Sequence, residues 1–112
     1  MPIAIIAITR NGARLGARLR EGLGSADLFV LRKYKGQAGK ESRAFDGELG
    51  ELMKLLWPQY RGFVCVMATG IVVRLIAPLV DCKDKDPAVV VMDDAGRFSI
   101  SLLSGHLGGG NT

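Results

Sequence analysis

Short apolar runs alternate with amphipathic segments along this chain. Residues 3–8 form an isoleucine-rich run bounded by turn residues, which predicts a buried strand. Leu15, Leu19 and Leu23 then recur at every fourth position, and this spacing predicts an amphipathic helix that opens after the turn at Asn11. The start of the chain is therefore typical of a strand that leads into a helix packed on a sheet.

The middle of the chain continues this alternation. Residues 27–31 and 63–67 are apolar runs of strand length. Between them, residues 32–43 are basic and hold two glycines, which predicts a mobile loop. Asp46 is placed to cap a second amphipathic helix, which Pro58 ends.

The last third of the chain predicts one more helix and a hairpin. Residues 68–70 predict a tight turn, and the nearly all-apolar residues 71–79 fit either a strand or a helix, of which the preceding alternation favours a buried helix. Residues 88–92 predict a strand, and residues 98–102 alternate apolar with polar positions after a turn at Gly96, which predicts its hairpin partner. The expected fold class is α/β, an open, mostly parallel Rossmann-like sheet flanked by helices, with a C-terminal β-hairpin.

Size and composition exclude several classes of protein. A chain of 112 residues, 48% hydrophobic and 23% charged, predicts a single globular domain over residues 1–112. Its apolar runs are shorter than the ~18 residues of a membrane helix, and its start lacks the basic leader of a signal peptide, so we expect a cytoplasmic protein with no membrane partner. A net charge of +4 favours anionic ligands only mildly, and the scattered lysines and arginines with 6% aromatic residues do not indicate nucleic-acid binding.

The cysteines do not indicate a metal or redox site. Cys65 and Cys82 form no CxxC pair and no cluster with histidine, so neither a zinc site nor a redox site is expected. Cys65 lies in an apolar run and is interpreted as a small buried hydrophobic residue.

Polar residues and glycines follow three of the predicted strands. They lie at residues 9–12, 67–70 and 104–111. In open α/β sheets ligands bind beyond the carboxyl ends of the strands, and helix N-termini there favour anions, so the three segments together predict a site for a ligand that bears a carboxylate or phosphate. Plain turns and helix caps are the alternative interpretation of each segment alone. Arg74, within an apolar helix, either extends to solvent or pairs in a cleft.

The glycine-rich end of the chain holds its only histidine, His106. A core histidine rarely sits among so many glycines, so we interpret His106 as a functional residue. The segment lacks the Lys-Ser/Thr ending of a P-loop, and the chain has neither a GxGxxG motif after its first strand nor a GxSxG nucleophile elbow. The sequence stops within this motif, and we therefore interpret the chain as the N-terminal domain of a longer enzyme.

Four segments together resemble the amino-terminal domain of the cobalt-precorrin-5A hydrolase (CbiG) family of anaerobic cobalamin biosynthesis. They are residues 3–13, 66–79, 86–91 and 101–109, of which Ala-Thr-Gly-Ile-Val-Val-Arg and Ser-Gly-His-Leu-Gly-Gly are the most specific. The resemblance implies hydrolytic opening of the δ-lactone of cobalt-precorrin-5A, with release of acetaldehyde, to give cobalt-precorrin-5B. It implies no cofactor, because the cobalt belongs to the tetrapyrrole substrate, and it implies further domains as partners.

From the chemistry of that reaction we predict roles for particular residues. Lactone opening needs a general base for water and donors for the developing oxyanion. The catalytic candidates are His106 as general acid/base, with Ser104 and Thr69. The substrate-binding candidates are Arg10, Asn11, Gly12, Gly70, Arg74, Gly105, Gly108, Gly109 and Asn111. Two alternatives stay open, a non-catalytic binding module for an anionic tetrapyrrole and an unrelated nucleotide-binding domain.

Overall fold

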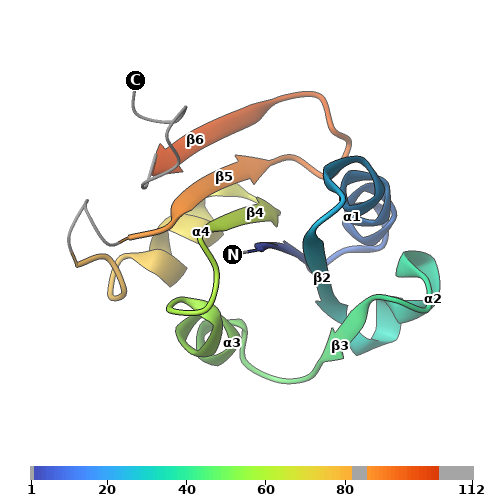
Figure 1. Ribbon diagram of the computed structural model, residues 1–112, viewed down its shortest axis with the longest axis horizontal. Coiled ribbons are helices and arrows are strands. Elements are labelled where there is room, and N and C mark those ends of the chain that lie inside the picture. Colours follow the sequence, from blue (N-terminus) through green and yellow to red (C-terminus); the bar gives the residue numbers. More distant parts are fainter. Residues whose placement is uncertain (1, 82–85, 104–112) are drawn as a thin grey trace.

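The computed structural model describes residues 2–81 and 86–103, which form one sheet and the helices around it (Figure 1). The elements in chain order are β1 (Ile3–Ala7), α1 (Arg10–Leu23), β2 (Ala26–Leu31), the 3-10 turn η1 (Arg32–Tyr34), α2 (Lys35–Ala38), β3 (Arg43–Phe45), α3 (Leu49–Leu56), β4 (Gly62–Val66), α4 (Thr69–Ile76), β5 (Ala88–Met92) and β6 (Ser99–Leu103).

The six strands are ordered β3-β2-β1-β4-β5-β6. Every neighbouring pair from β3 to β5 is parallel, and β6 pairs with β5 in the antiparallel sense. This confirms the predicted open, mostly parallel α/β sheet with a C-terminal hairpin. The chain moves outward from β1 through β2 to β3 and then returns to β4, so the order of the strands reverses between β1 and β4. In such sheets this reversal is where ligands bind.

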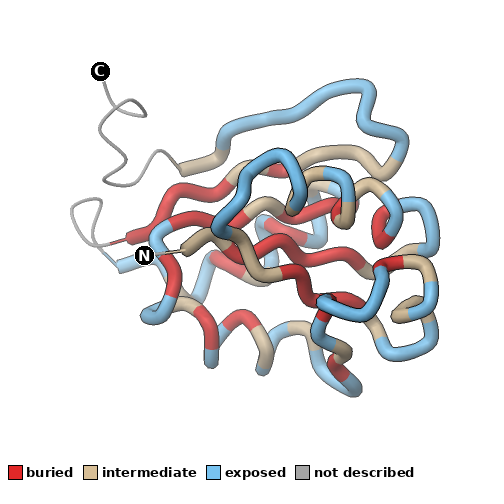
Figure 2. Tube along the Cα trace, turned by 45° about the vertical axis from the view of Figure 1, so that its right-hand side comes forward, coloured by how far each residue is buried: buried red, intermediate tan, exposed pale blue. Residues whose placement is uncertain are grey.

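Helices cover both faces of the sheet. Side chains of a strand point alternately to opposite faces, and in β1 Ile6 packs in the cluster with Met53 of α3 and Val72 of α4, all of them buried. Its neighbours in β1 point the other way, where Ile5 and Ala7 pack with Ala13 of α1. Most residues of the central strands are therefore buried, whereas β6 is largely exposed (Figure 2).

The basic segment after β2 is ordered, contrary to the prediction of a mobile loop over residues 32–43. It forms η1 and α2 and then enters β3, which pairs in parallel with β2. Lys35 stabilises the bend that follows, because its Nζ donates hydrogen bonds to the backbone oxygens of Gly39, Lys40 and Ser42. The sequence pattern missed β3 because a strand of three residues is too short to show an alternation.

Two predicted helix starts are also wrong. Asp46 does not cap α3, whose N-cap residue is Glu48 without a side-chain hydrogen bond. Asp46 instead accepts hydrogen bonds from Nε of Arg32 at 2.9 and 3.0 Å. In place of the tight turn predicted at residues 68–70, α4 already begins at Thr69.

The helix predicted over residues 71–79 is present as α4, although it ends at Ile76, and it is buried on one side only. Val72 is fully buried, whereas Val73 is 47% exposed. Within residues 2–81 and 86–103, neither α4 nor any other helix has the length and apolar character needed to cross a membrane.

Candidate functional site

A hollow of about 370 Å³ lies where β1, β4 and β5 end, at the edge toward which the arrows of β4 and β5 point (Figure 1). Its lining residues are Ile8, Thr9, Met67, Ala68, Ile71, Asp93 and Asp94. The hollow therefore lies beside the reversal of strand order between β1 and β4, where the fold favours ligand binding. The backbone N–H of Met67 donates to the carbonyl oxygen of Met92 at 3.1 Å and holds the ends of β4 and β5 together there.

Thr9 connects the end of β1 to the turn after β5. Its Oγ1 accepts a hydrogen bond from the backbone N–H of Gly12 at 2.9 Å, which makes Thr9 the N-cap of α1. The same hydroxyl donates to Oδ2 of Asp94 at 3.1 Å. One side chain thus caps the helix and holds a carboxylate at the hollow.

We expect Thr9→Val to lower the free energy of unfolding by about 1–2 kcal/mol, because valine keeps the shape of threonine but can neither cap α1 nor donate to Asp94. Thr9→Ser keeps the hydroxyl and should differ from the wild type by less than about 0.5 kcal/mol. Urea unfolding followed by circular dichroism measures both values. Equal stabilities for the valine and serine variants would contradict the capping role.

Asp93 builds the turn between β5 and β6. Its Oδ1 accepts the backbone N–H groups of Arg97 at 2.7 Å and Phe98 at 3.1 Å, and its Oδ2 accepts Nε of Arg97 at 3.1 Å. Desolvation is the largest single influence on the pKa of Asp93 and raises it, but these donors and the charge of Arg97 together hold the pKa below its usual value. Gly96 closes the turn with a φ of 73°, as predicted.

Asp94 is less fully engaged than Asp93. Its Oδ2 accepts the Thr9 hydroxyl, and within the described part of the chain no hydrogen bond reaches its Oδ1. It stands half-buried at the rim of a lining that is otherwise mostly apolar, with Met67 5% exposed. Sequence reasoning missed both aspartates as site residues, because Asp-Asp-Ala-Gly reads as a turn until β5 is known to lie beside β4.

The two carboxylates make this hollow acidic. The sequence predicted that these strand ends favour a carboxylate or phosphate. At the hollow itself Asp94 would repel such a group, whereas Asp93 is paired with Arg97. Cations lie outside the lining. Arg10 and Asn11 are exposed in the first turn of α1, next to Thr9.

The other residues predicted at these two strand ends differ in their burial and in their distance from the lining of the hollow. Gly12 is buried, and a Cβ there would lie 2.8 Å from Oγ1 of Thr9 and 3.4 Å from Cγ1 of Val66, so this glycine allows the close packing of α1 on the sheet. Thr69 and Gly70 are in the first turn of α4. The hollow is lined by their neighbours Ala68 and Ile71 and not by Thr69 or Gly70 themselves. Arg74 is exposed, so it extends to solvent, which was one of its two interpretations. Among the described residues it forms no ion pair.

The third predicted strand end lies at the opposite edge of the sheet. Because β6 is antiparallel, its last residue Leu103 pairs with Val89, near the start of β5, whereas Ser99 pairs with Met92 near the hollow. The expectation that all three strand ends meet at one edge is therefore wrong for β6. The remaining candidates, Ser104, Gly105, His106, Gly108, Gly109 and Asn111, lie outside the described residues.

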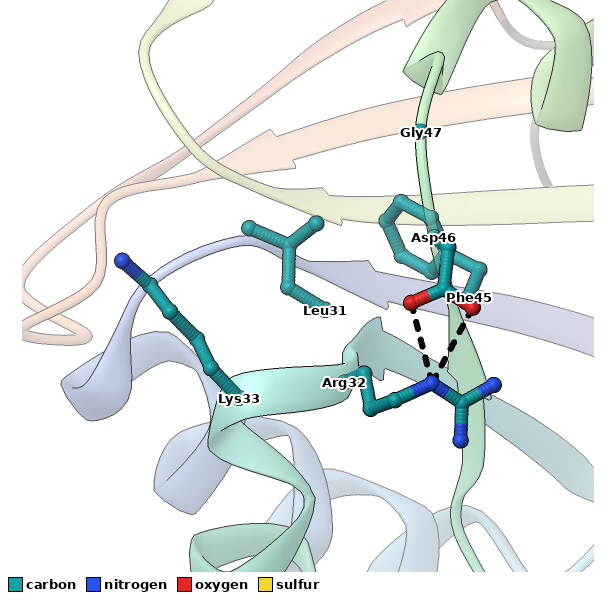
Figure 3. A pocket seen from close by; sticks show the side chains of 6 residues that line it. All are labelled: Leu31, Arg32, Lys33, Phe45, Asp46 and Gly47. Atoms are coloured by element: carbon teal, nitrogen blue, oxygen red, sulfur yellow. Dashed lines mark hydrogen bonds and ion pairs between the residues drawn. The ribbon is translucent and has the colours of Figure 1, made fainter.

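A second hollow, of about 480 Å³, lies at the ends of β2 and β3 (Figure 3). Leu31 and Phe45 supply its apolar side chains, and Arg32 and Asp46 form an ion pair beside them. The hydrogen bond from Arg32 lowers the pKa of Asp46. Since the two side chains are 63% and 68% exposed, this pair contributes little to stability and mainly orients Arg32.

Cys65 is a structural residue, as predicted. It lies in β4 with no exposed surface, and burial raises the pKa of its thiol to about 12, so it is not a nucleophile at neutral pH. Within residues 2–81 and 86–103, His, Cys, Asp and Glu side chains form no group of three that could hold a metal ion.

Comparisons with known proteins agree on one family. The model of the family described as cobalamin synthesis G N-terminal matches residues 51–112. The cobalt-precorrin-5A hydrolase of Priestia megaterium is 38% identical over 110 residues, which are 96% of this chain and 29% of that protein. The corresponding protein of Salmonella typhimurium is 39% identical over 111 residues, 97% of this chain and 30% of its own length.

A solved structure has the same fold. It is a crystal structure described as a cobalamin biosynthesis protein G homolog from Sulfolobus solfataricus, with a TM-score of 0.71 and 26% identity. The match covers 96% of this chain and 30% of that one. The chain therefore spans less than a third of the length of the relatives it matches.

Proposed function

This chain belongs to the cobalamin synthesis G N-terminal family, and from that membership we propose that it is the substrate-binding N-terminal domain of a cobalt-precorrin-5A hydrolase, acting in cobalamin biosynthesis. The observation that carries the proposal is the near-complete match of the chain, 96–97% of its length, to two proteins named cobalt-precorrin-5A hydrolase. The hollow at the reversal of strand order supports it, because it gives the domain a binding site where this fold favours one.

The tetrapyrrole would contact this edge of the sheet at two kinds of surface. Part of its apolar ring would enter the hollow between Ile8, Met67 and Ile71. Its peripheral carboxylates would lie outside, where Arg10 is exposed on α1 and Arg74 on α4. The cobalt is part of the substrate, so the proposal assigns no cofactor and no metal ligand to this chain.

The proposed reaction is hydrolysis of the δ-lactone. Water adds to the lactone carbonyl, the ring C–O bond breaks, and the departing oxygen takes a proton, which leaves a carboxylic acid and a hydroxyl. The freed hydroxyl then loses its proton and becomes the carbonyl of acetaldehyde as the adjoining C–C bond breaks. The electron pair of that bond stays with the tetrapyrrole, which takes up a proton and becomes cobalt-precorrin-5B. His106 would transfer protons, and Ser104 and the amides of the glycine-rich segment would stabilise the oxyanion. Thr69 begins α4 at the opposite end of the sheet from Leu103, so the proposal does not place it at the same oxyanion.

The second candidate function is binding of the tetrapyrrole without catalysis. The chain spans only 29–30% of the length of its named relatives, and this favours a module that binds the tetrapyrrole while the remaining domains supply the chemistry. One experiment separates the two.

The chain is titrated anaerobically into cobalt-precorrin-5A, and both the visible absorption of the tetrapyrrole and the acetaldehyde released are measured. The proposal predicts saturable binding. If the chain also performs the hydrolysis, one molecule of acetaldehyde is released for each substrate molecule consumed. Binding without release of acetaldehyde would show that the chain acts as a binding module only. The absence of binding at concentrations well above those of the substrate would overturn the proposal for this chain.

A further inference from the structure

Asp94 occupies an unusual position among the charged residues of this edge. It is half-buried beside the apolar lining of the hollow, and the Thr9 hydroxyl holds its Oδ2 at 3.1 Å. Its neighbour Asp93 is fully used by the turn and is neutralised by Arg97. Within the described residues, Asp94 forms no ion pair with a cation.

A carboxylate in these surroundings prefers particular partners. A charged group beside apolar side chains is stable only when its lone pairs accept hydrogen bonds, and Thr9 supplies one donor to one of the two oxygens. A ligand carboxylate at the same place would be repelled by Asp94, whose charge no cation among the described residues pairs. An O–H or N–H group carried on an apolar framework meets both demands, because its framework packs on Met67 and Ile71 while its hydrogen points to Oδ1.

We infer that Asp94 is a specificity residue of the hollow, whose Oδ1 accepts a hydrogen bond from a neutral O–H or N–H donor of the bound ligand. Thr9 is the positioning residue that holds the carboxylate in place. The inference rests on the proposed function and deepens it. The hollow takes a neutral, donor-bearing part of the tetrapyrrole, and the carboxylates of the ligand remain at the exposed arginines.

The turn does not need Asp94 for this role. Asp93 makes all three hydrogen bonds from Arg97 and Phe98, and Gly96 supplies the positive φ. Replacing Asp94 is therefore expected to leave the turn and the pairing of β6 with β5 intact. The only hydrogen bond it removes within the described residues is the one from Thr9.

The test compares the binding of cobalt-precorrin-5A to Asp94→Ala, Asp94→Asn and Glu21→Gln by absorption titration. A hydrogen bond to a charged acceptor predicts that Asp94→Ala raises the dissociation constant about 10- to 100-fold. Asp94→Asn keeps a neutral acceptor and should fall between the alanine variant and the wild type. Glu21→Gln removes the same charge from the exposed surface of α1 and should stay within about twofold of the wild type.

The sign of the effect decides the outcome. If Asp94 only repels an anionic ligand, Asp94→Ala binds as tightly as the wild type or more tightly, and the inference is overturned while the proposed function stands. If the wild-type chain binds nothing, the proposed function itself fails. Far-UV circular dichroism and urea midpoints confirm folding of each variant, and Asp94→Asn decides alone if the alanine variant does not fold.

Discussion

Replacing Phe63 with alanine is expected to lower the free energy of unfolding by about 3–5 kcal/mol. Phe63 is the second residue of β4, is 1% exposed, and packs in the same cluster as buried residues of α3 and α4. Its ring stacks on Trp57 with centroids 5.5 Å apart and meets the edge of Tyr60 at 6.0 Å. The substitution removes the apolar burial of the ring, both aromatic contacts and the volume that the neighbouring helices pack against.

Urea unfolding of the wild type and Phe63→Ala measures this loss. Because domains of this size are stable by only about 5–15 kcal/mol, the variant should be partly unfolded at temperatures where the wild type is folded. Phe98→Ala is the matched control, since Phe98 is 57% exposed and its loss should change stability by less than about 0.5 kcal/mol. Similar losses for the two variants would show that the cluster around Phe63 is not the main core.

Much of this fold can be predicted from local pattern. The run over residues 88–92 coincides with β5, and the predicted hairpin partner coincides with β6 to within one residue. The strand β5 is predictable because buried parallel strands are continuous apolar runs, and β6 because its apolar and polar positions alternate after a turn. The strand β3 is not, because its three residues include the exposed Arg43 and it is defined only by pairing with β2.

The site is less predictable because it depends on which strands are neighbours. The residues after β1 and β4 meet as expected, but the third side of the hollow comes from Asp93 and Asp94 after β5. Nothing in the local sequence distinguishes those aspartates from ordinary turn residues. The reversal of β6 was implicit in the predicted hairpin, and it separates Leu103 from the hollow by the length of β5.

His106 carries the largest expected effect on activity. Histidine is the side chain that most readily both accepts and donates a proton near neutral pH, and His106 is the only one in the chain. If it transfers protons during lactone opening, His106→Ala should lower the rate of acetaldehyde release by about 10²- to 10⁴-fold. The affinity for cobalt-precorrin-5A should change much less, because proton transfer contributes to the transition state rather than to binding.

His106→Gln separates proton transfer from hydrogen bonding in the same position. Glutamine keeps a donor and an acceptor but does not titrate, so it should be nearly as slow as the alanine variant while binding as well as the wild type. Ser101→Ala, on the exposed part of β6, is the control for changes near this end of the chain and should leave the rate unchanged. Rates for both His106 variants within about threefold of the wild type would remove His106 from the chemistry. A rise in the dissociation constant with an unchanged maximal rate would instead make it a binding residue, which is the behaviour expected of a domain that holds the tetrapyrrole for chemistry performed elsewhere.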